Sequence, residues 1–166
     1  MKWLRAGVVA CAWHCAACGA NEDSPAEDGC ALTIKLTGAV AVQADGSHAC
    51  GGSGVYPPGP RTVVTFMDVG ELKLAFTLDG VSEGATGIFP TVVAVSEASA
   101  GTSWSTPGGG CTLEVTQHKK VHEDQLMREY RMGGNGACGV PAEPGPNATG
   151  TVEVGNFRVV GMIGWE

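Results

Sequence analysis

Short runs in which hydrophobic and polar residues alternate recur along the chain. The clearest run is 71–78, where the hydrophobic positions are Leu72, Leu74, Phe76 and Leu78. Residues 32–37 repeat the pattern with Leu32, Ile34 and Leu36. A period of two is typical of a β-strand that buries one face, so both runs are predicted strands.

Further strands are predicted at 63–67, at 91–95 and between 152 and 163, where Gly155-Asn156 suits a tight turn. Residues 111–117 and 126–132 are expected to form a hairpin around 118–125. A helix over 119–130 is the competing interpretation, because good helix formers are frequent there. Asp45-Gly46 is a predicted turn, and glycine and proline make 51–60 and 101–110 predicted loops.

These elements predict an all-β fold, a small antiparallel β-sandwich of about seven to nine short strands. A partly open barrel is the alternative. The composition agrees, because glycine is abundant, with 26 residues, and only 16% of the residues are charged. A chain of 166 residues suits one domain, which we place at 30–166.

The N-terminus has the layout of an export signal. Lys2 and Arg5 precede an apolar stretch at 6–17, which is too short to span a bilayer as a helix. Ala16-Ala17 then precede Cys18, and polar residues follow. This layout resembles the signal of bacterial lipoproteins, in which small residues precede a cysteine that is lipidated.

The resemblance implies that 1–17 is removed, that Cys18 carries diacylglycerol and a further acyl chain such as palmitate, and that 18–29 is a flexible tether. It implies a lipid-anchored protein of the cell envelope, with Gly19 after the cysteine favouring the outer membrane. Cys11, after Val8-Val9-Ala10, is the alternative lipidation site. The lipid bilayer is then a partner through the acylated N-terminus.

Four cysteines remain after Cys18, an even number that predicts two disulfides in an exported domain. Cys111 opens one strand of the predicted hairpin and Cys138 follows the other, which favours Cys111–Cys138 and leaves Cys30–Cys50. The other two pairings stay open. No Cys-x₂₋₄-Cys spacing follows Cys18, so we expect no zinc site and no other metal or cofactor.

The charge argues against nucleic acid as a partner. The net charge is −7, and removal of 1–17 would take Lys2 and Arg5 and leave −9. Phosphate binding needs clustered basic residues, and the single adjacent pair is Lys119-Lys120.

Three motifs in the sequence resemble chemical or binding sites. Gly101-Thr-Ser-Trp-Ser105 lacks the last glycine of the hydrolase elbow, so we expect a surface turn. His118 and His122 have metal-ligand spacing but no glutamate directly after His118, so we expect an exposed hairpin loop. Trp104, Tyr56 and Trp165 could stack on sugars, although packing is the default expectation for each.

The sequence therefore predicts a non-enzymatic lipoprotein that acts as a binding or structural module of the envelope, with an envelope protein or a glycan as its partner. The alternative is an inhibitor or accessory subunit of an envelope enzyme, with loops 51–60 and 101–110 as its contact surface.

Overall fold

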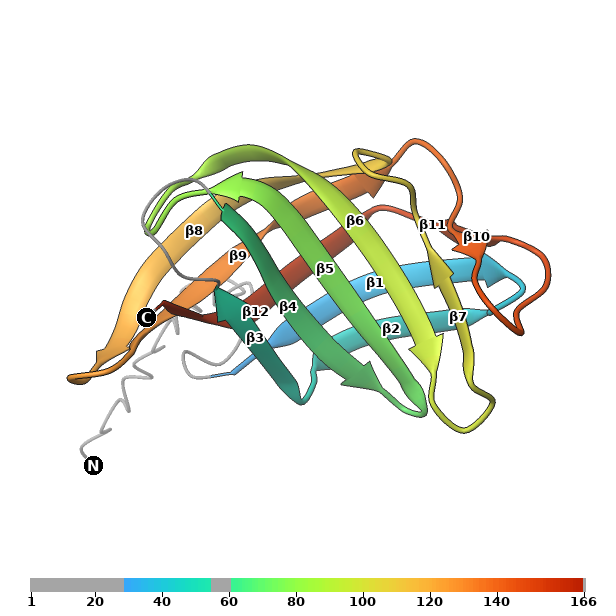
Figure 1. Ribbon diagram of the computed structural model, residues 1–166, viewed down its shortest axis with the longest axis horizontal. Helices are drawn as coiled ribbons and strands as arrows, with labels where there is room; N and C mark the ends of the chain where they lie inside the picture. Colours follow the sequence, from blue (N-terminus) through green and yellow to red (C-terminus); the bar gives the residue numbers. More distant parts are fainter. Residues whose placement is uncertain (1–28, 55–60, 166) are drawn as a thin grey trace, which may run out of the picture.

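The computed structural model describes residues 29–54 and 61–165, most of which lie in β-strands (Figure 1). The predicted signal peptide, Cys18 with the alternative Cys11, and residues 18–28 of the predicted tether lie outside the described residues. The described strands are β1 (Ala31–Gly38), β2 (Val42–Ser47), β3 (Cys50–Gly54), β4 (Arg61–Val69), β5 (Leu72–Val81), β6 (Gly87–Glu97), β7 (Thr102–Ser105), β8 (Cys111–Glu123), β9 (Arg128–Cys138), β10 (Glu143–Pro144), β11 (Val152–Val154) and β12 (Phe157–Trp165).

All of these strands belong to one antiparallel sheet. Its main path runs β11-β1-β12-β9-β8-β6-β5-β4-β3, with β2 beside β1, and with β7 joined to β6 and β10 to β7. Most neighbours in this path are also close in sequence, so the chain meanders from β3 to β9 before β12 returns beside β1. The predicted all-β, antiparallel fold with two disulfides is confirmed.

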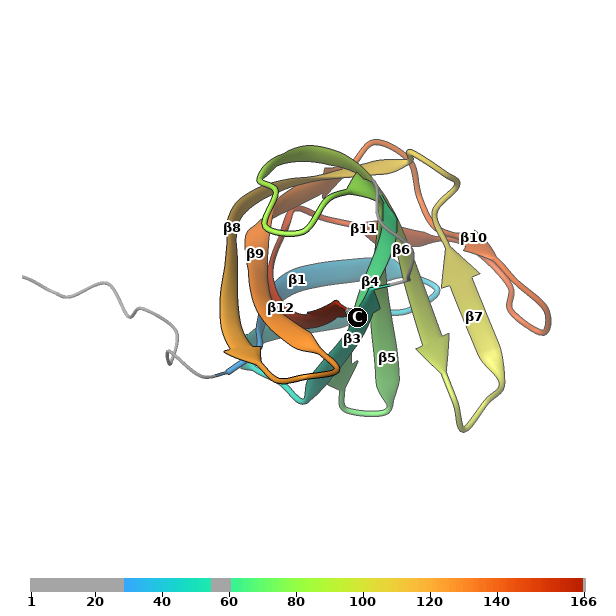
Figure 2. The ribbon, with the colours of Figure 1, turned by 60° about the vertical axis from the view of Figure 1, so that its left-hand side comes forward.

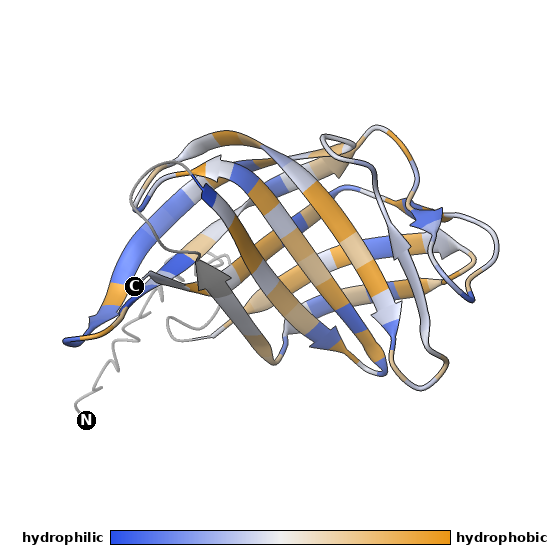
Figure 3. Cartoon of the chain, viewed as in Figure 1, coloured by the Kyte–Doolittle hydropathy of each residue, from blue (hydrophilic) through white to orange (hydrophobic). Residues whose placement is uncertain are grey.

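The sheet rolls up so that its two halves face each other (Figures 1 and 2). The two facing layers expected of a sandwich are therefore both formed by one sheet. Rolling buries the hydrophobic face that the alternation at 71–78 predicted. On β5 the buried residues are Leu72, Leu74, Phe76 and Leu78. Figure 3 shows the same alternation along several strands. Across the core, the rings of Phe76 on β5 and Phe157 on β12 lie 5.2 Å apart, which places the two halves of the sheet in direct contact.

The roll closes at a seam, the line where β12 meets β3 and β4. In the described chain β3 forms a hydrogen-bonded ladder with β4 alone, so its contact with β12 is packing without a ladder. Glycine makes this approach feasible. A Cβ at Gly52 of β3 would lie 2.0 Å from the carbonyl oxygen of Met162, and one at Gly161 would lie 2.1 Å from Oγ1 of Thr65.

Both predicted disulfides are present. Cys30–Cys50 joins the residue before β1 to the first residue of β3 and therefore lies at the seam. Cys111–Cys138 joins paired positions of β8 and β9. Each cross-link limits the unfolded chain and so stabilises the fold.

Several local predictions were wrong. Asp45-Gly46 lies inside β2, where it faces Thr33 and Leu32 of β1, and is not a turn. The predicted loop at 51–60 begins with β3, and the one at 101–110 contains β7. The competing helix over 119–130 is not formed, because most of that stretch belongs to β8 and β9. No helix long and apolar enough to cross a membrane occurs in the part of the chain described.

The seam predicts the effect of Gly52→Ala. The new Cβ would overlap two backbone carbonyl oxygens, on Met162 and Val64, so one of the strands must shift. We expect a loss of about 1–3 kcal/mol in the free energy of unfolding, measured by urea denaturation of the oxidised protein. Gly139→Ala is the matched control, because no atom lies within 4 Å of a Cβ there. Equal stability of the two variants would contradict the role of Gly52.

Candidate functional site

The β8–β9 hairpin projects past the body of the rolled sheet (Figures 1 and 2). β8 pairs with β6 only through residues 111–115, whereas its pairing with β9 continues to Glu123 and Arg128. The far half of β8 therefore has a sheet neighbour on one side alone. The hairpin predicted from the sequence is confirmed, with longer strands than expected.

The tip of the hairpin, residues 121–127, has a defined shape because Asp124 organises it. Its Oδ1 accepts hydrogen bonds from the backbone N–H groups of Leu126 and Met127, both at 2.8 Å. The backbone N–H of Asp124 in turn donates to the carbonyl of Met127 at 2.9 Å. These two backbone donors hold the pKa of the Asp124 carboxyl below its usual value. The carboxylate is therefore ionised when it caps the turn.

Three apolar side chains are exposed on this tip. Val121 is 53% exposed, Leu126 85% and Met127 36%. Met127 is partly covered because it lies over Gly164 of β12, where a Cβ would come within 3.0 Å of its sulfur. These three residues lie within seven positions of one ordered turn, which makes the tip the candidate contact surface of the hairpin.

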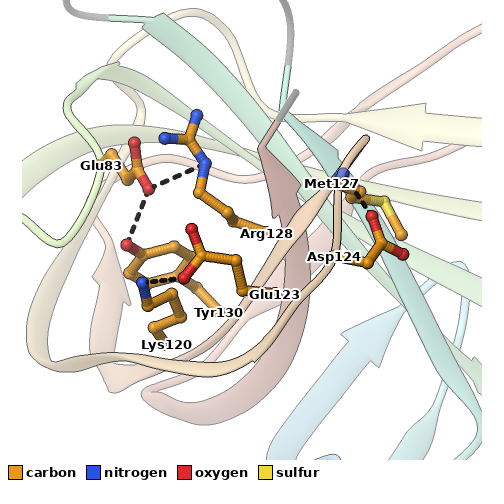
Figure 4. A network of polar contacts seen from close by, with 7 residues as sticks. All are labelled: Glu83, Lys120, Glu123, Asp124, Met127, Arg128 and Tyr130. Atoms are coloured by element: carbon orange, nitrogen blue, oxygen red, sulfur yellow. Dashed lines mark hydrogen bonds and ion pairs between the residues drawn. The ribbon is translucent and has the colours of Figure 1, made fainter.

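Next to the tip lies the part of the hairpin called here its base, residues 118–120 and 128–130, which Glu83 ties to the turn between β5 and β6 (Figure 4). Oε1 of Glu83 accepts a hydrogen bond from the Tyr130 hydroxyl at 2.7 Å and lies 3.4 Å from Nε of Arg128. The hydrogen bond to Glu83 raises the pKa of Tyr130 to about 12. On the opposite strand, Lys120 pairs with Glu123 and lowers the pKa of that carboxyl. These contacts hold the base in one arrangement.

His118 lies buried at this base, which corrects the expectation that it belongs to an exposed loop. Its ring packs edge-on against Tyr130, with centroids 5.1 Å apart, and lies 6.1 Å from the ring of Trp165. Nδ1 is 2.9 Å from the carbonyl oxygen of Ala85, so Nδ1 carries the proton and donates it, because a carbonyl only accepts. Nε2 of His118 and Nε1 of Trp165 are buried without a hydrogen-bond partner in the described structure.

Burial is the main influence on His118 and lowers its pKa, against smaller opposing effects from the Ala85 carbonyl and Glu83. The ring is therefore neutral near pH 7, with Nε2 as an acceptor. His122 is exposed and lies 3.9 Å from Asp124. His118 and His122 have the sequence spacing of a metal-ligand pair, but the first is buried and the second is exposed to solvent. Within the described ranges no cluster of three metal-binding side chains is found.

The other candidate residues are structural. Trp104 and Trp165 are buried, so neither offers a face to a sugar, and the packing expected by default is confirmed for both. The Trp104 indole N–H donates to the carbonyl of Gly150 at 3.1 Å. Ser103 lies within β7 rather than on a turn before a helix, and Tyr56 lies outside the described residues. The loop at 101–110 therefore lacks the exposed aromatic residue that a contact surface would use.

Glu83, Tyr130 and the exposed Leu126 were not predicted from the sequence as part of a site. Leu126-Met127 in a charged stretch was the available signal for the tip, since apolar residues in a hairpin turn are unusual. Glu83 gave no signal, because its contact with Tyr130 joins positions 47 apart in the chain.

His118 predicts a loss of stability on mild acidification. Its pKa is lowered in the folded protein and is ordinary, 6.5, in the unfolded chain. As the pH falls through 6.5 the unfolded state gains a proton that the folded state resists, so unfolding becomes easier. We expect the urea midpoint to fall between pH 7.5 and 5, and to fall less in His118→Asn.

His122→Asn is the matched control, because it makes the same substitution at an exposed ring of the same hairpin. Glu123 and Asp124 have lowered pKa values and lose their stabilising effect at more acidic pH than this window. An identical pH dependence in His118→Asn and wild type would contradict the assignment to His118.

Comparison with protein-family models, with curated proteins and with solved structures finds no match to this chain. No relative therefore supplies an activity or a ligand. Because a fold does not imply a function, the function is argued from the surfaces of the molecule themselves.

Proposed function

We propose that the protein is an exported lipoprotein, anchored through Cys18, whose folded domain binds an envelope protein with the tip of the β8–β9 hairpin. The observation that carries the proposal is the exposure of Leu126, 85%, on a turn held by Asp124. An apolar side chain displayed on a rigid turn loses little conformational entropy when a partner covers it.

Export is supported by the two disulfides, which persist in oxidising compartments. The direction of β1 also suits an anchor near the hairpin. Ala31 pairs with Val160, and β1 then runs away from the hairpin end toward Gly38 beside Val152. The chain from Cys18 would enter the domain from the hairpin side, over a span of at most about 40 Å.

A protein suits the tip better than a lipid surface, because the charges around the tip have both signs. The hairpin between 119 and 131 carries four basic and three acidic residues. An anionic bilayer attracts the basic residues and repels the acidic ones, so the two effects oppose each other. A protein surface can match each charge individually. An inhibitor or accessory subunit of an envelope enzyme would use the same contact and is the alternative form of this proposal.

The anchor is tested by the intact mass of the full-length protein made in a bacterial host. We expect a chain that begins at Cys18, carries acyl groups and shows four further thiols only after reduction. Cys18→Ser should abolish lipidation and processing, whereas Cys11→Ser should leave both unchanged. An unlipidated chain with another N-terminus would contradict the anchor.

The hairpin contact is tested by placing a photo-crosslinking amino acid at position 126 in cells that make the protein. We expect one discrete adduct with an envelope protein, lost when Val121→Ser and Met127→Ser are combined with the probe. The same probe at Glu71, an exposed position in the turn between β4 and β5, is the control. Equal adducts at 71 and 126, or crosslinks to lipid alone at 126, would contradict the proposal.

A further inference from the structure

We propose that the protein has a second binding site, for a neutral polysaccharide chain, on the outer face of the sheet formed by β1, β2, β6, β8, β9 and β12. This site, called here the polar row, contains no residue of the hairpin tip and requires neither the anchor nor the hairpin partner. It therefore goes beyond the proposed function.

The polar row is a line of side chains in register across the sheet. Ile88 is opposite Glu114, Glu114 opposite Asn135, and Asn135 opposite Arg158. Arg158 is in turn opposite Thr33, and Thr33 opposite Asp45. All six residues are exposed, so the row runs perpendicular to the strands along the outside of the molecule. With strands about 4.8 Å apart, five steps span about 24 Å, a length that suits a chain of sugars rather than one ring.

Two hollows follow this row and meet at Thr33 and Arg158. The first has a volume of about 590 Å³ and lies along Glu114, Asn135 and Arg158. The second has a volume of about 350 Å³ and reaches Asp45. Ala137, two positions along β9 from Asn135 and on the same outer face, keeps this part of the first hollow low because its side chain is short. The row is thus an open trough and not a line of crowded side chains.

The central side chains of the row are not engaged with the rest of the protein. In the described structure Glu114, Asn135 and Arg158 make no side-chain hydrogen bond and no ion pair, although Arg158 lies between two carboxylates along the row. Thr33 and Asp45 bond each other, with Oγ1 donating to Oδ1 at 2.8 Å. Three polar groups are therefore available to a ligand without breaking an internal contact.

The order of donors and acceptors selects the ligand class. Glu114 and Asp45 accept hydrogen bonds, Arg158 donates them, and the Asn135 amide does both. A hydroxyl group both donates and accepts, so a polyhydroxylated chain can satisfy each position in turn. A polyanion would be repelled by the two carboxylates and by the net charge of −7, whereas a polycation would be attracted by them but would give Arg158 no hydrogen-bond acceptor.

A peptide is a poorer fit than a glycan. A peptide strand binds a sheet by adding to a free edge, and each strand in the centre of this row is already paired on both sides. Ile88, 71% exposed at one end of the row, supplies an apolar surface on which the C–H face of a sugar ring can pack. A neutral polysaccharide lying across the strands uses every member of the row.

The test is native affinity electrophoresis of the full chain in detergent, in gels that contain galactomannan, hydroxyethylcellulose, soluble starch, dextran or alginate. We expect at least one neutral polysaccharide to retard the protein. Glu114→Ala and Arg158→Ala should each weaken binding about tenfold or more, because each removes a charged hydrogen-bonding group. Glu71→Ala is the matched control and should migrate as wild type.

Thermal melting of each variant provides the folding control, since exposed substitutions should leave it nearly unchanged. Three outcomes would overturn the proposal: no retardation by any neutral polysaccharide, retardation by alginate alone, or retardation that Glu114→Ala and Arg158→Ala leave intact. None of these outcomes affects the crosslinking result at position 126, so the two proposals fail independently.

Discussion

The seam between β12 and β3–β4 is the constraint on which the rest of the structure depends. A sheet that curls must bring two distant segments together, and here the backbones at Gly52 and Met162 approach so closely that a Cβ would overlap a carbonyl oxygen. No hydrogen-bonded ladder connects β3 with β12 in the described chain, so close packing and the Cys30–Cys50 disulfide hold this line. The core exists only because the seam closes around it.

The two proposed surfaces follow from this closure in different ways. The polar row is continuous because β1 and β2 are carried round beside β12, which places Thr33 next to Arg158 although the two are far apart in sequence. The hairpin tip is exposed on one side because the far half of β8 has no second strand beside it, whereas β9 stays paired with β12 as far as Arg128. Beyond Val115, β8 leaves β6 and continues with β9 alone. The polar row thus results from the rolling of the sheet, and the exposed tip from the far half of β8, which pairs with β9 alone.

The sequence predicted the parts of the fold that local patterns control. Alternation at 71–78 predicted β5. The even number of cysteines predicted two disulfides, and the predicted hairpin favoured Cys111–Cys138, which left Cys30–Cys50. β3 was missed because this glycine-rich segment is a strand here through its ladder with β4, a pairing that its own residues do not signal. Asp45-Gly46 was misread as a turn for a similar reason, since pairing with β1 outweighs its local preference.

The candidate sites were still harder to predict than the fold. Glu114, Asn135 and Arg158 each look like ordinary outward residues of a strand, and only the register aligns them. His118 was expected in solvent because residues 118–125 were predicted to form the exposed loop of the hairpin. In the structure its ring is buried against Tyr130 of β9 and near Trp165 of β12. A line of side chains across several strands has no sequence signature, because its members are separated by the lengths of the strands between them.

Charge explains how an acidic protein could use its hairpin for recognition. The chain carries −7, but the segment from 119 to 131 is close to neutral because its basic and acidic residues nearly balance. Screening limits each exposed charge to about 8 Å at physiological ionic strength, so a partner at the tip meets individual charges of both signs rather than the net charge of the body. Long-range steering should then contribute little, and specificity should come from matching charges around a covered Leu126. The Asp124 turn and the Glu83 contacts matter to that interaction because they fix where this side chain is held.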